Sequence, residues 1–200
     1  MLHPTRDLRL LALVLKGIYI TVWRFTHQGP GASAKWLLTQ VAQRGFGTPV
    51  MRHSRATPHL YVGGGINARG WQRLQAVGVD AIVNLRQEKP VESRGVTPAA
   101  YLCLPTPDDH APTLEQLEQG STFMAGAIDQ KRGVYVHCAS GVGRAPTMAA
   151  AYLVTTGLSL DDALTNIRRV RPFIRPTPVQ MERLVSFVAR HNGRSATNNL

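Results

Sequence analysis

The sequence predicts an α/β protein with a central, mostly parallel sheet flanked by helices, preceded by an amphipathic helical extension. Three observations lead to this prediction. From residue 59 onward, short apolar runs typical of buried strands alternate with segments whose apolar residues recur at helical spacing. The length of 200 residues suffices for one well-buried domain. Hydrophobic residues make up 44% and charged residues 18% of the chain, as in globular proteins.

The predicted strands are short apolar runs bounded by glycine or polar residues. They cover residues 60–62, 81–85, 101–104 and 134–136. Val, Ile, Leu and Tyr dominate these runs, as expected for strands that are buried on both faces of a parallel sheet. Because Cys103 lies within the third run, we expect its side chain to belong to the core.

Helix boundaries are marked by capping residues. Thr113 is followed three residues later by Gln116, which makes a capping box, and Ser159 is followed in the same way by Asp162. Pro178 suits the first position of the last helix. Helices are therefore expected over residues 68–77, from 113 onward, over 145–156, and after residues 159 and 177.

Charge divides the chain into two parts. Residues 1–58 hold eight Lys or Arg and one Asp, a net charge of +7, whereas residues 59–200 carry +4. We interpret residues 1–58 as a basic amphipathic extension made of a membrane-associating helix plus linker. Residues 59–190 then form the α/β domain, and residues 191–200 a flexible tail.

The extension begins with the most apolar stretch of the chain, residues 8–25, which predicts an amphipathic helix. Its cationic residues fall within one narrow sector, and apolar residues fill the rest of the helix circumference. The cationic set is Arg6, Arg9, Lys16, Arg24 and His27; the apolar set is Leu8, Leu10, Leu11, Leu15, Ile18, Val22 and Phe25. This pattern favours a helix in the interface of an anionic membrane, contacting it through residues 6–27. The alternatives are a marginal single membrane span and a helix docked on the protein's own core.

Two segments rich in Gly, Pro, Ser and Arg, residues 29–33 and 45–58, predict linkers. Between them, Trp36, Leu37 and Val41 indicate a short helix.

The number and spacing of the cysteines indicate the redox environment and whether a bound metal is expected. Cys103 and Cys138 are too few for a disulfide framework, and neither stands at a metal-ligand spacing from a histidine. We therefore expect no metal and no cofactor, and a reducing, cytoplasmic location at the periphery of a membrane. The basic residues lack interleaved aromatic stacking platforms, which disfavours nucleic acid as a partner.

The segment that follows the fourth predicted strand carries the candidate chemistry. A glycine-bearing loop between a strand and a helix N-terminus binds anions through its backbone N–H groups and the helix dipole. Cys138 stands at the base of this loop, where such a field favours the nucleophilic thiolate, and Arg144 supplies a planar fork for two phosphate oxygens. The candidate phosphate-binding residues are Ala139, Ser140, Gly141, Val142, Gly143 and Arg144.

His137-Cys138, five further residues, Arg144 and a helix resemble the signature of the protein tyrosine phosphatase superfamily, in its small (atypical) dual-specificity branch. The resemblance covers about residues 59–190 and implies a dual-specificity phosphatase-like fold and a metal-free reaction through a cysteinyl-phosphate. Ala145 departs from the family pattern, which usually has Ser or Thr after the arginine. That hydroxyl stabilises the cysteine thiolate as it leaves, so its absence bears on the second step.

The resemblance also implies a general acid, an Asp in the loop before the helix that precedes the signature strand. The candidates are adjacent, Asp108 and Asp109. Some relatives' spacing selects Asp108, which we favour, and others' selects Asp109, which stays the alternative.

The function expected from these residues is the hydrolysis of phosphate monoesters in phosphoproteins, phospholipids or other phosphoesters. The alternative, from another functional class, is a catalytically weak phosphate-binding adaptor at a membrane surface. Because the loop and both acids lie downstream, we expect a chain starting near residue 58 to fold and to hydrolyse a small aryl phosphate.

Overall fold

The computed structural model describes residues 4–89 and 95–197, and its centre is a four-stranded sheet. The strands pair in parallel throughout, in the order β1-β4-β2-β3, which confirms the predicted α/β class. β4 is therefore an inner strand, and its carboxyl end lies beside those of β1 and β2. The strands are β1 (Leu60–Gly63), β2 (Val79–Arg86), β3 (Ala100–Thr106) and β4 (Gly133–His137).

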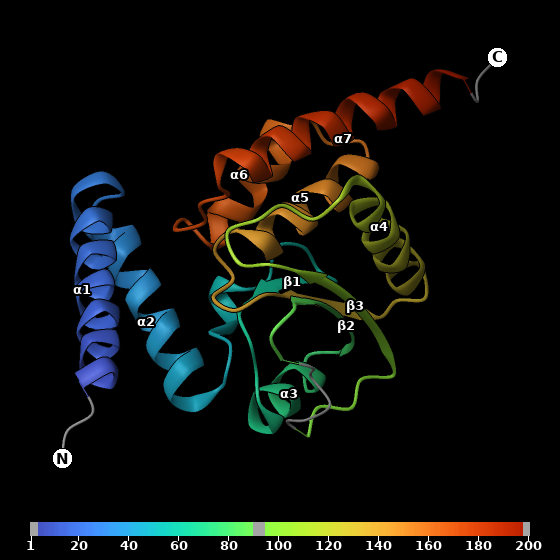
Figure 1. Ribbon diagram of the computed structural model, residues 1–200. Helices are drawn as coiled ribbons and strands as arrows, with labels where there is room; N and C mark the ends of the chain where they lie inside the picture. Colours follow the sequence, from blue (N-terminus) through green and yellow to red (C-terminus); the bar gives the residue numbers. More distant parts are fainter. Residues whose placement is uncertain (1–3, 90–94, 198–200) are drawn as a thin grey trace.

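Helices cover both faces of the sheet (Figure 1). Four of them pack on one face, and the short helix α3 packs on the other. Alternation along the strands supplies both cores: Val83 and Val136 face the four-helix side, whereas Ile82 and Tyr135 face α3. The four are α4 (Leu114–Asp129), α5 (Arg144–Thr155), α6 (Leu160–Val170) and α7 (Pro178–Thr197), with α3 at Ala68–Gln75.

The caps predicted from the sequence are present. The Thr113 hydroxyl accepts the N–H of Gln116 at 3.1 Å, and the Gln116 side chain accepts the N–H of Thr113, which closes the capping box. Ser159 accepts the N–H of Asp162 at the start of α6. Local sequence therefore sets where these helices begin.

Helix α7 continues to Thr197, so it extends into residues 191–200, the segment expected to be a flexible tail. Ion pairs with α4 hold this end of the helix. Arg190 Nε lies 2.9 Å and Arg194 Nη1 2.7 Å from Glu118 Oε1. These partners are more than seventy residues apart in sequence, so no local pattern announces them.

Two helices of the extension, α1 (Pro4–His27) and α2 (Pro30–Phe46), lie side by side at one edge of the domain (Figure 1). The predicted linker at residues 29–33 is wrong. Gly29, with φ of 79°, turns the chain in one residue, and Pro30 then starts α2 with its φ already helical. The second predicted linker begins only at Gly47 and contains a 3₁₀ turn over Met51–His53.

The basic stripe predicted on the first helix needs a correction at Arg24. Its side chain is buried: Nη1 donates to the carbonyl of Phe173 at 3.1 Å, and the guanidinium lies 4.7 Å from the ring centroid of Trp36. His27 is exposed as expected. The remaining cations, Arg6, Arg9 and Lys16, are outside the side chains that the structure describes.

The outward face of the two helices is apolar, whereas α2 contacts the domain partly through polar side chains. Gln40 donates to the carbonyl of Ser140 at 3.3 Å, and Gln43 lies 3.5 Å from the hydroxyl of Tyr135. Within residues 4–89 and 95–197, no helix is both long and apolar enough to cross a bilayer. The exposed apolar residues are Leu15, Ile18, Tyr19, Val22 and Phe25 on α1, and Leu37, Leu38, Val41 and Phe46 on α2.

Candidate active site

The loop between β4 and α5 is anchored to the end of the neighbouring strand β1. The N–H of Cys138 donates to the carbonyl of Gly63 at 3.3 Å, and Gly65 donates to the carbonyl of Ala139 at 3.2 Å. Cys138 is buried, with 2% of its surface exposed. The sheet order thus places the thiol at the carboxyl edge of the two inner strands, where ligands of parallel α/β sheets bind.

Gly141 gives the loop its shape. Its φ of 68° is left-handed, and its N–H donates to Cys138 Sγ at 3.2 Å. A Cβ at this position would overlap the backbone of Gly63 and the guanidinium of Arg171. Beyond the loop, α5 starts at Arg144 with no side-chain cap and no acidic residue in its first turn. The helix N-terminus therefore keeps N–H groups and positive potential for an anion.

Arg171 holds the loop from behind. It is fully buried and donates from Nε to the carbonyl of Gly141 at 3.2 Å, from Nη1 to that of His53 at 2.6 Å, and from Nη2 to that of Ser140 at 3.5 Å. Burial lowers the pKa of Arg171 to about 10. The sequence alone assigned Arg171 no role, because an arginine at the end of a helix is equally typical of a solvent-exposed C-cap residue.

Arg144 is held on one side and open on the other. Nη1 donates to the carbonyls of Thr106 at 2.7 Å and Leu85 at 3.3 Å. Nε and Nη2 are buried, and neither has a hydrogen-bond partner among the described residues. Nη2 has only a charge contact, 2.7 Å from Oδ1 of Asp108. Nε and Nη2 form the side-on edge with which arginine grips two oxygens of one oxyanion.

The structure distinguishes the two acid candidates by what they contact. The Asp108 carboxylate is 74% exposed and reaches Arg144, as above. Asp109 adopts φ of 62°, and its carbonyl accepts the hydroxyl of Thr177 at 3.2 Å. Gln180 ties the same loop to α7 by donating to the carbonyl of His110 at 2.8 Å. The loop is thus fixed through its backbone, which leaves the Asp108 carboxylate at the loop surface.

A cleft of about 580 Å³ unites these groups. It contains the thiol, Arg144 and both acid candidates, but α1 and α2 form part of its wall. The loop and both acid candidates lie downstream of residue 58, but part of the cleft wall around them does not. The docking of Arg24 and Gln40 on the domain brings these helices to the loop. The helices contribute Gly17, Ile20, Arg24, Trp36, Gln40 and Arg44.

Cys103 lies outside the core, so the prediction that it belongs to the core is wrong. It is exposed on β3, the edge strand of the sheet, and does not line the cleft. Only one face of an edge strand is covered here, so alternate residues of β3 turn outward. Within the described parts of the chain, no three His, Cys, Asp or Glu side chains gather as metal ligands.

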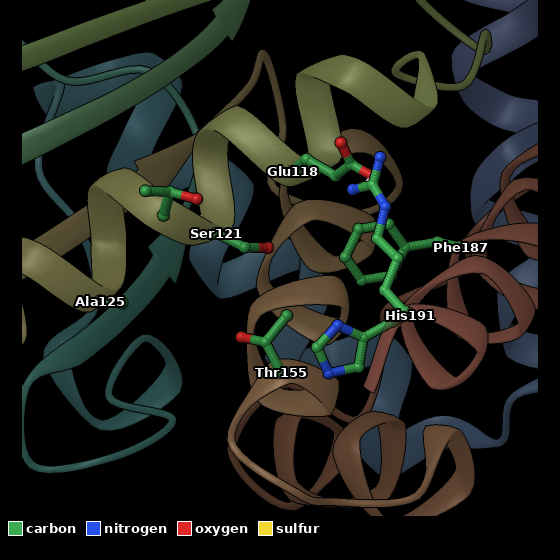
Figure 2. Close-up of a pocket in the computed structure, with 8 residues that line it drawn as sticks. Glu118, Ser121, Ala125, Thr155, Phe187 and His191 are labelled. Carbon is green, nitrogen blue, oxygen red and sulfur yellow. Dashed lines mark hydrogen bonds and ion pairs between the residues drawn. The ribbon is translucent and has the colours of Figure 1, made fainter. Parts of the chain in front are cut away.

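A second cleft, of about 460 Å³, lies between α4, α5 and α7 (Figure 2). Glu118, Ser121 and Thr155 line it together with His191. It shares no residue with the loop after β4 and contains no thiol, so the candidate chemistry belongs to the first cleft.

Comparison with known proteins identifies the fold and loop. The family described as "Dual specificity phosphatase, catalytic domain" matches residues 60–190. The chain belongs to the dual specificity phosphatase family. It carries the family's catalytic domain, which is that of a cysteine-dependent phosphatase. The family match begins at β1, so α1 and α2 lie outside it.

Individual relatives agree with this assignment. The chain is 29% identical to human dual specificity protein phosphatase 1 over 132 residues, which cover 65% of this chain and 35% of that protein. It is 30% identical to rat protein phosphatase Slingshot homolog 3 over 138 residues, 68% of this chain and 21% of that one. The chain thus spans about a third or less of the length of these curated relatives.

Solved structures of the family superpose on the same region. A crystal structure of PTPMT1 matches with a TM-score of 0.64 and 27% identity, covering 72% of this chain and 98% of that one. Human DUSP28 matches with a TM-score of 0.62 and 25% identity, covering 70% and 99%. These neighbours place the protein among the atypical members of the family.

Gly141→Ala should disable anion binding by the loop. The methyl group would meet the Gly63 backbone and force a residue with a Cβ into left-handed φ, which we expect to cost about 2–4 kcal/mol of stability. Affinity for inorganic phosphate, measured by calorimetry, should fall at least tenfold. Gly157→Ala is the matched control, because φ is 98° there but nothing lies within 4 Å of a Cβ. Equal loss of phosphate binding in the control would refute the role given to Gly141.

Proposed function

We propose that this protein hydrolyses phosphate monoesters through a cysteinyl-phosphate intermediate. The observation that carries the proposal is the Nε–Nη2 edge of Arg144, which lines the same cleft as the Cys138 thiol. Neither nitrogen has a hydrogen-bond partner among the described residues, and the Asp108 carboxylate makes only a charge contact with Nη2. Buried donors without hydrogen-bond partners are costly unless a ligand satisfies them. A phosphate group fits both donors at once and brings phosphorus to the nucleophile.

The residues divide the reaction between them. Cys138 thiolate attacks phosphorus and forms the S–P bond while the ester P–O bond breaks, and Arg144 with the loop N–H groups holds the non-bridging oxygens. Asp108, protonated, gives its proton to the departing oxygen. Asp108 carboxylate then takes a proton from water, whose oxygen attacks phosphorus and releases phosphate and the thiolate. The Asp108 carboxylate lies 2.7 Å from Nη2 of Arg144, on the edge that would hold a phosphate oxygen.

Both phosphoproteins and phospholipids fall within the proposed substrate range. The dual-specificity branch supports the first. A structure of PTPMT1 in complex with PI(5)P supports the second, because that protein aligns over 70% of this chain at a TM-score of 0.64.

We place this activity at an anionic membrane surface facing a reducing, cytoplasmic compartment. On α1, the cleft-lining residues Gly17, Ile20 and Arg24 lie on one side of the helix, and the exposed apolar residues lie on the opposite side. Nine of the large exposed apolar side chains gather on α1 and α2, in the segment with net charge +7. Apolar area beside excess positive charge suits the interface of an anionic bilayer.

A catalytically weak phosphate-binding adaptor is the second candidate. Ala145 favours it, because a buried methyl stands where the family pattern usually has the hydroxyl of Ser or Thr. Among the described residues, the only hydrogen bond given to Cys138 Sγ is the N–H of Gly141. A burst of product followed by arrest would favour the adaptor over the enzyme.

Cys138→Ser should abolish the release of nitrophenol from p-nitrophenyl phosphate, at least a thousandfold in kcat, because the hydroxyl is a far weaker nucleophile. Binding of inorganic phosphate should persist, since Arg144 and the loop amides remain. Cys103→Ser, on the exposed edge strand, should leave turnover unchanged. Substantial multiple turnover by Cys138→Ser would exclude the covalent mechanism.

Asp108→Asn should slow hydrolysis of an alkyl phosphate much more than that of p-nitrophenyl phosphate, because nitrophenolate leaves without a proton. We expect about 100-fold or more on the alkyl ester, within the range of general acid catalysis. Asp109→Asn should change both rates by less than about threefold. If Asp109→Asn gives the leaving-group dependence instead, the acid is the neighbouring residue.

Vesicle sedimentation tests the membrane proposal. The full-length protein should pellet with phosphatidylglycerol-containing vesicles, and added salt should weaken binding only in part, since apolar insertion persists. Leu15→Gln with Val22→Gln should reduce pelleting about tenfold, because two inserted side chains are lost. Val179→Gln with Val185→Gln is the control, since both are exposed apolar residues of α7. Equal pelleting of both double variants would contradict the assignment of this face.

A further inference from the structure

Three arginines of the cleft lie outside the catalytic loop, and their charges are not balanced by described carboxylates. Arg24 comes from α1, Arg44 from α2 and Arg175 from the segment before α7. None of them forms an ion pair with any carboxylate whose side chain the structure describes. Several of those carboxylates pair instead with other arginines: Asp108 with Arg144, and Glu115 and Glu118 with Arg190. The cleft therefore has more positive charge than one bound phosphate group requires.

Tryptophan rings hold two of these arginines in place. The Arg24 guanidinium lies 4.7 Å from the ring centroid of Trp36, and that of Arg175 lies 3.7 Å from Trp23. Stacking fixes a guanidinium plane and leaves its edge donors free. Arg175 stacks on Trp23, and Trp23 directly precedes Arg24 in α1, so the charge of Arg175 acts on Arg24.

The proximity of the two cations is unfavourable without an anion. Burial, together with the charge of Arg175, lowers the pKa of Arg24 to about 10. Arg24 is 5% exposed; Nη1 is satisfied by Gln28 and the carbonyl of Phe173, but Nε is buried without a described hydrogen-bond partner. A buried, unsatisfied donor beside a second cation is the local environment of an oxyanion site.

The acidic residues of the same cleft do not supply the anion that would pair with Arg24 and Arg175. Asp108 pairs with Arg144, and Asp109 forms no ion pair among the described side chains. Both belong to the acid loop, which is tied to Thr177 and Gln180 of the α7 end. All three arginines line the cleft, and neither of its aspartates is ion-paired with any of them.

We propose that Arg24, Arg44 and Arg175 form a second oxyanion subsite, which binds a further phosphate group while the catalytic loop holds the phosphate to be cleaved. The inference deepens the proposed function and rests on it for the identity of the first phosphate. It selects phosphomonoesters that carry a second phosphate over those that carry one. The second phosphate belongs either to the substrate itself or to a neighbouring lipid headgroup, which offers the same chemistry.

The experiment uses a matched ligand series: the monophosphates and bisphosphates of propane-1,3-diol, butane-1,4-diol and hexane-1,6-diol. Calorimetry with full-length Cys138→Ser protein measures binding without turnover. At least one bisphosphate should bind about tenfold or more tightly than its monophosphate, beyond the twofold statistical advantage. Adding Arg44→Gln and Arg175→Gln should abolish this preference and leave monophosphate affinity within about twofold. Arg24 is left unchanged, because its buried guanidinium donates to the carbonyl of Phe173 and so docks α1 on the domain.

Arg69→Gln with Arg73→Gln is the control for net charge, because both residues are exposed on α3 and line neither cleft. It should keep the bisphosphate preference. If the second phosphate comes from a lipid, the diol series shows no preference. In that case Arg44→Gln with Arg175→Gln should lose the phosphatidylglycerol-dependent part of vesicle binding, and the α3 control should keep it.

Overturning the subsite requires that neither readout distinguishes the cleft variant from the α3 control. The proposed function fails separately, when wild-type protein releases no phosphate from p-nitrophenyl phosphate or any diol ester. A bisphosphate preference in an inert protein would support the subsite and the adaptor together.

Discussion

A buried cation organises the candidate active site. Removing the Arg171 guanidinium from water costs several kcal/mol, on the order expected for any buried ion, and that cost must be offset locally. Three backbone carbonyls do so, at 2.6, 3.2 and 3.5 Å. Two of them belong to the catalytic loop and the third to His53, so one side chain ties the loop to the segment that precedes β1. Peptide groups whose carbonyls turn toward Arg171 direct their N–H groups the other way, and the N–H of Gly141 indeed reaches Cys138 Sγ.

A second buried arginine completes the frame from the opposite side. Arg144 Nη1 binds the carbonyls of Leu85 and Thr106, which lie at the ends of β2 and β3. Since β4 lies between β1 and β2, its carboxyl end positions Cys138 between the end of β1, which binds the loop, and the end of β2, which binds Arg144. The parallel sheet thus fixes the nucleophile and the oxyanion fork relative to one another, and neither depends on loop rigidity alone. Each arginine has donors satisfied by backbone carbonyls, and Arg144 also keeps an Nε–Nη2 edge that has no hydrogen-bond partner among the described residues and that the Asp108 carboxylate contacts.

Sequence patterns predicted the strands, the helix caps and the seven-residue loop, because near neighbours in the chain determine these features. They failed wherever a contact joins distant segments. Arg171 is thirty residues from Gly141, and Arg24 is 149 residues from Phe173. Helix α2 also inverts the usual rule for amphipathic helices. Gln40 and Gln43 face the domain, where a carbonyl and a hydroxyl need partners, and this leaves Leu37 and Leu38 outside. Hydrophobic periodicity alone assigns the opposite face.

Docking of the extension and occupation of the cleft are linked, because they use the same residues. Arg24 anchors α1 to the carbonyl of Phe173 and also lines the cleft, and Gln40 of α2 does both for the carbonyl of Ser140. An anion that binds the cleft only when the helices are docked adds RT ln(1 + [L]/Kd) to the docked state, about 2.7 kcal/mol at 100 times Kd. By the same linkage, a surface that holds α1 and α2 in place raises affinity for that anion. By this linkage, helices outside the family's catalytic domain influence anion binding in its cleft. They do so through Arg24 and Gln40, which turn inward from a pair of helices whose outward face is apolar.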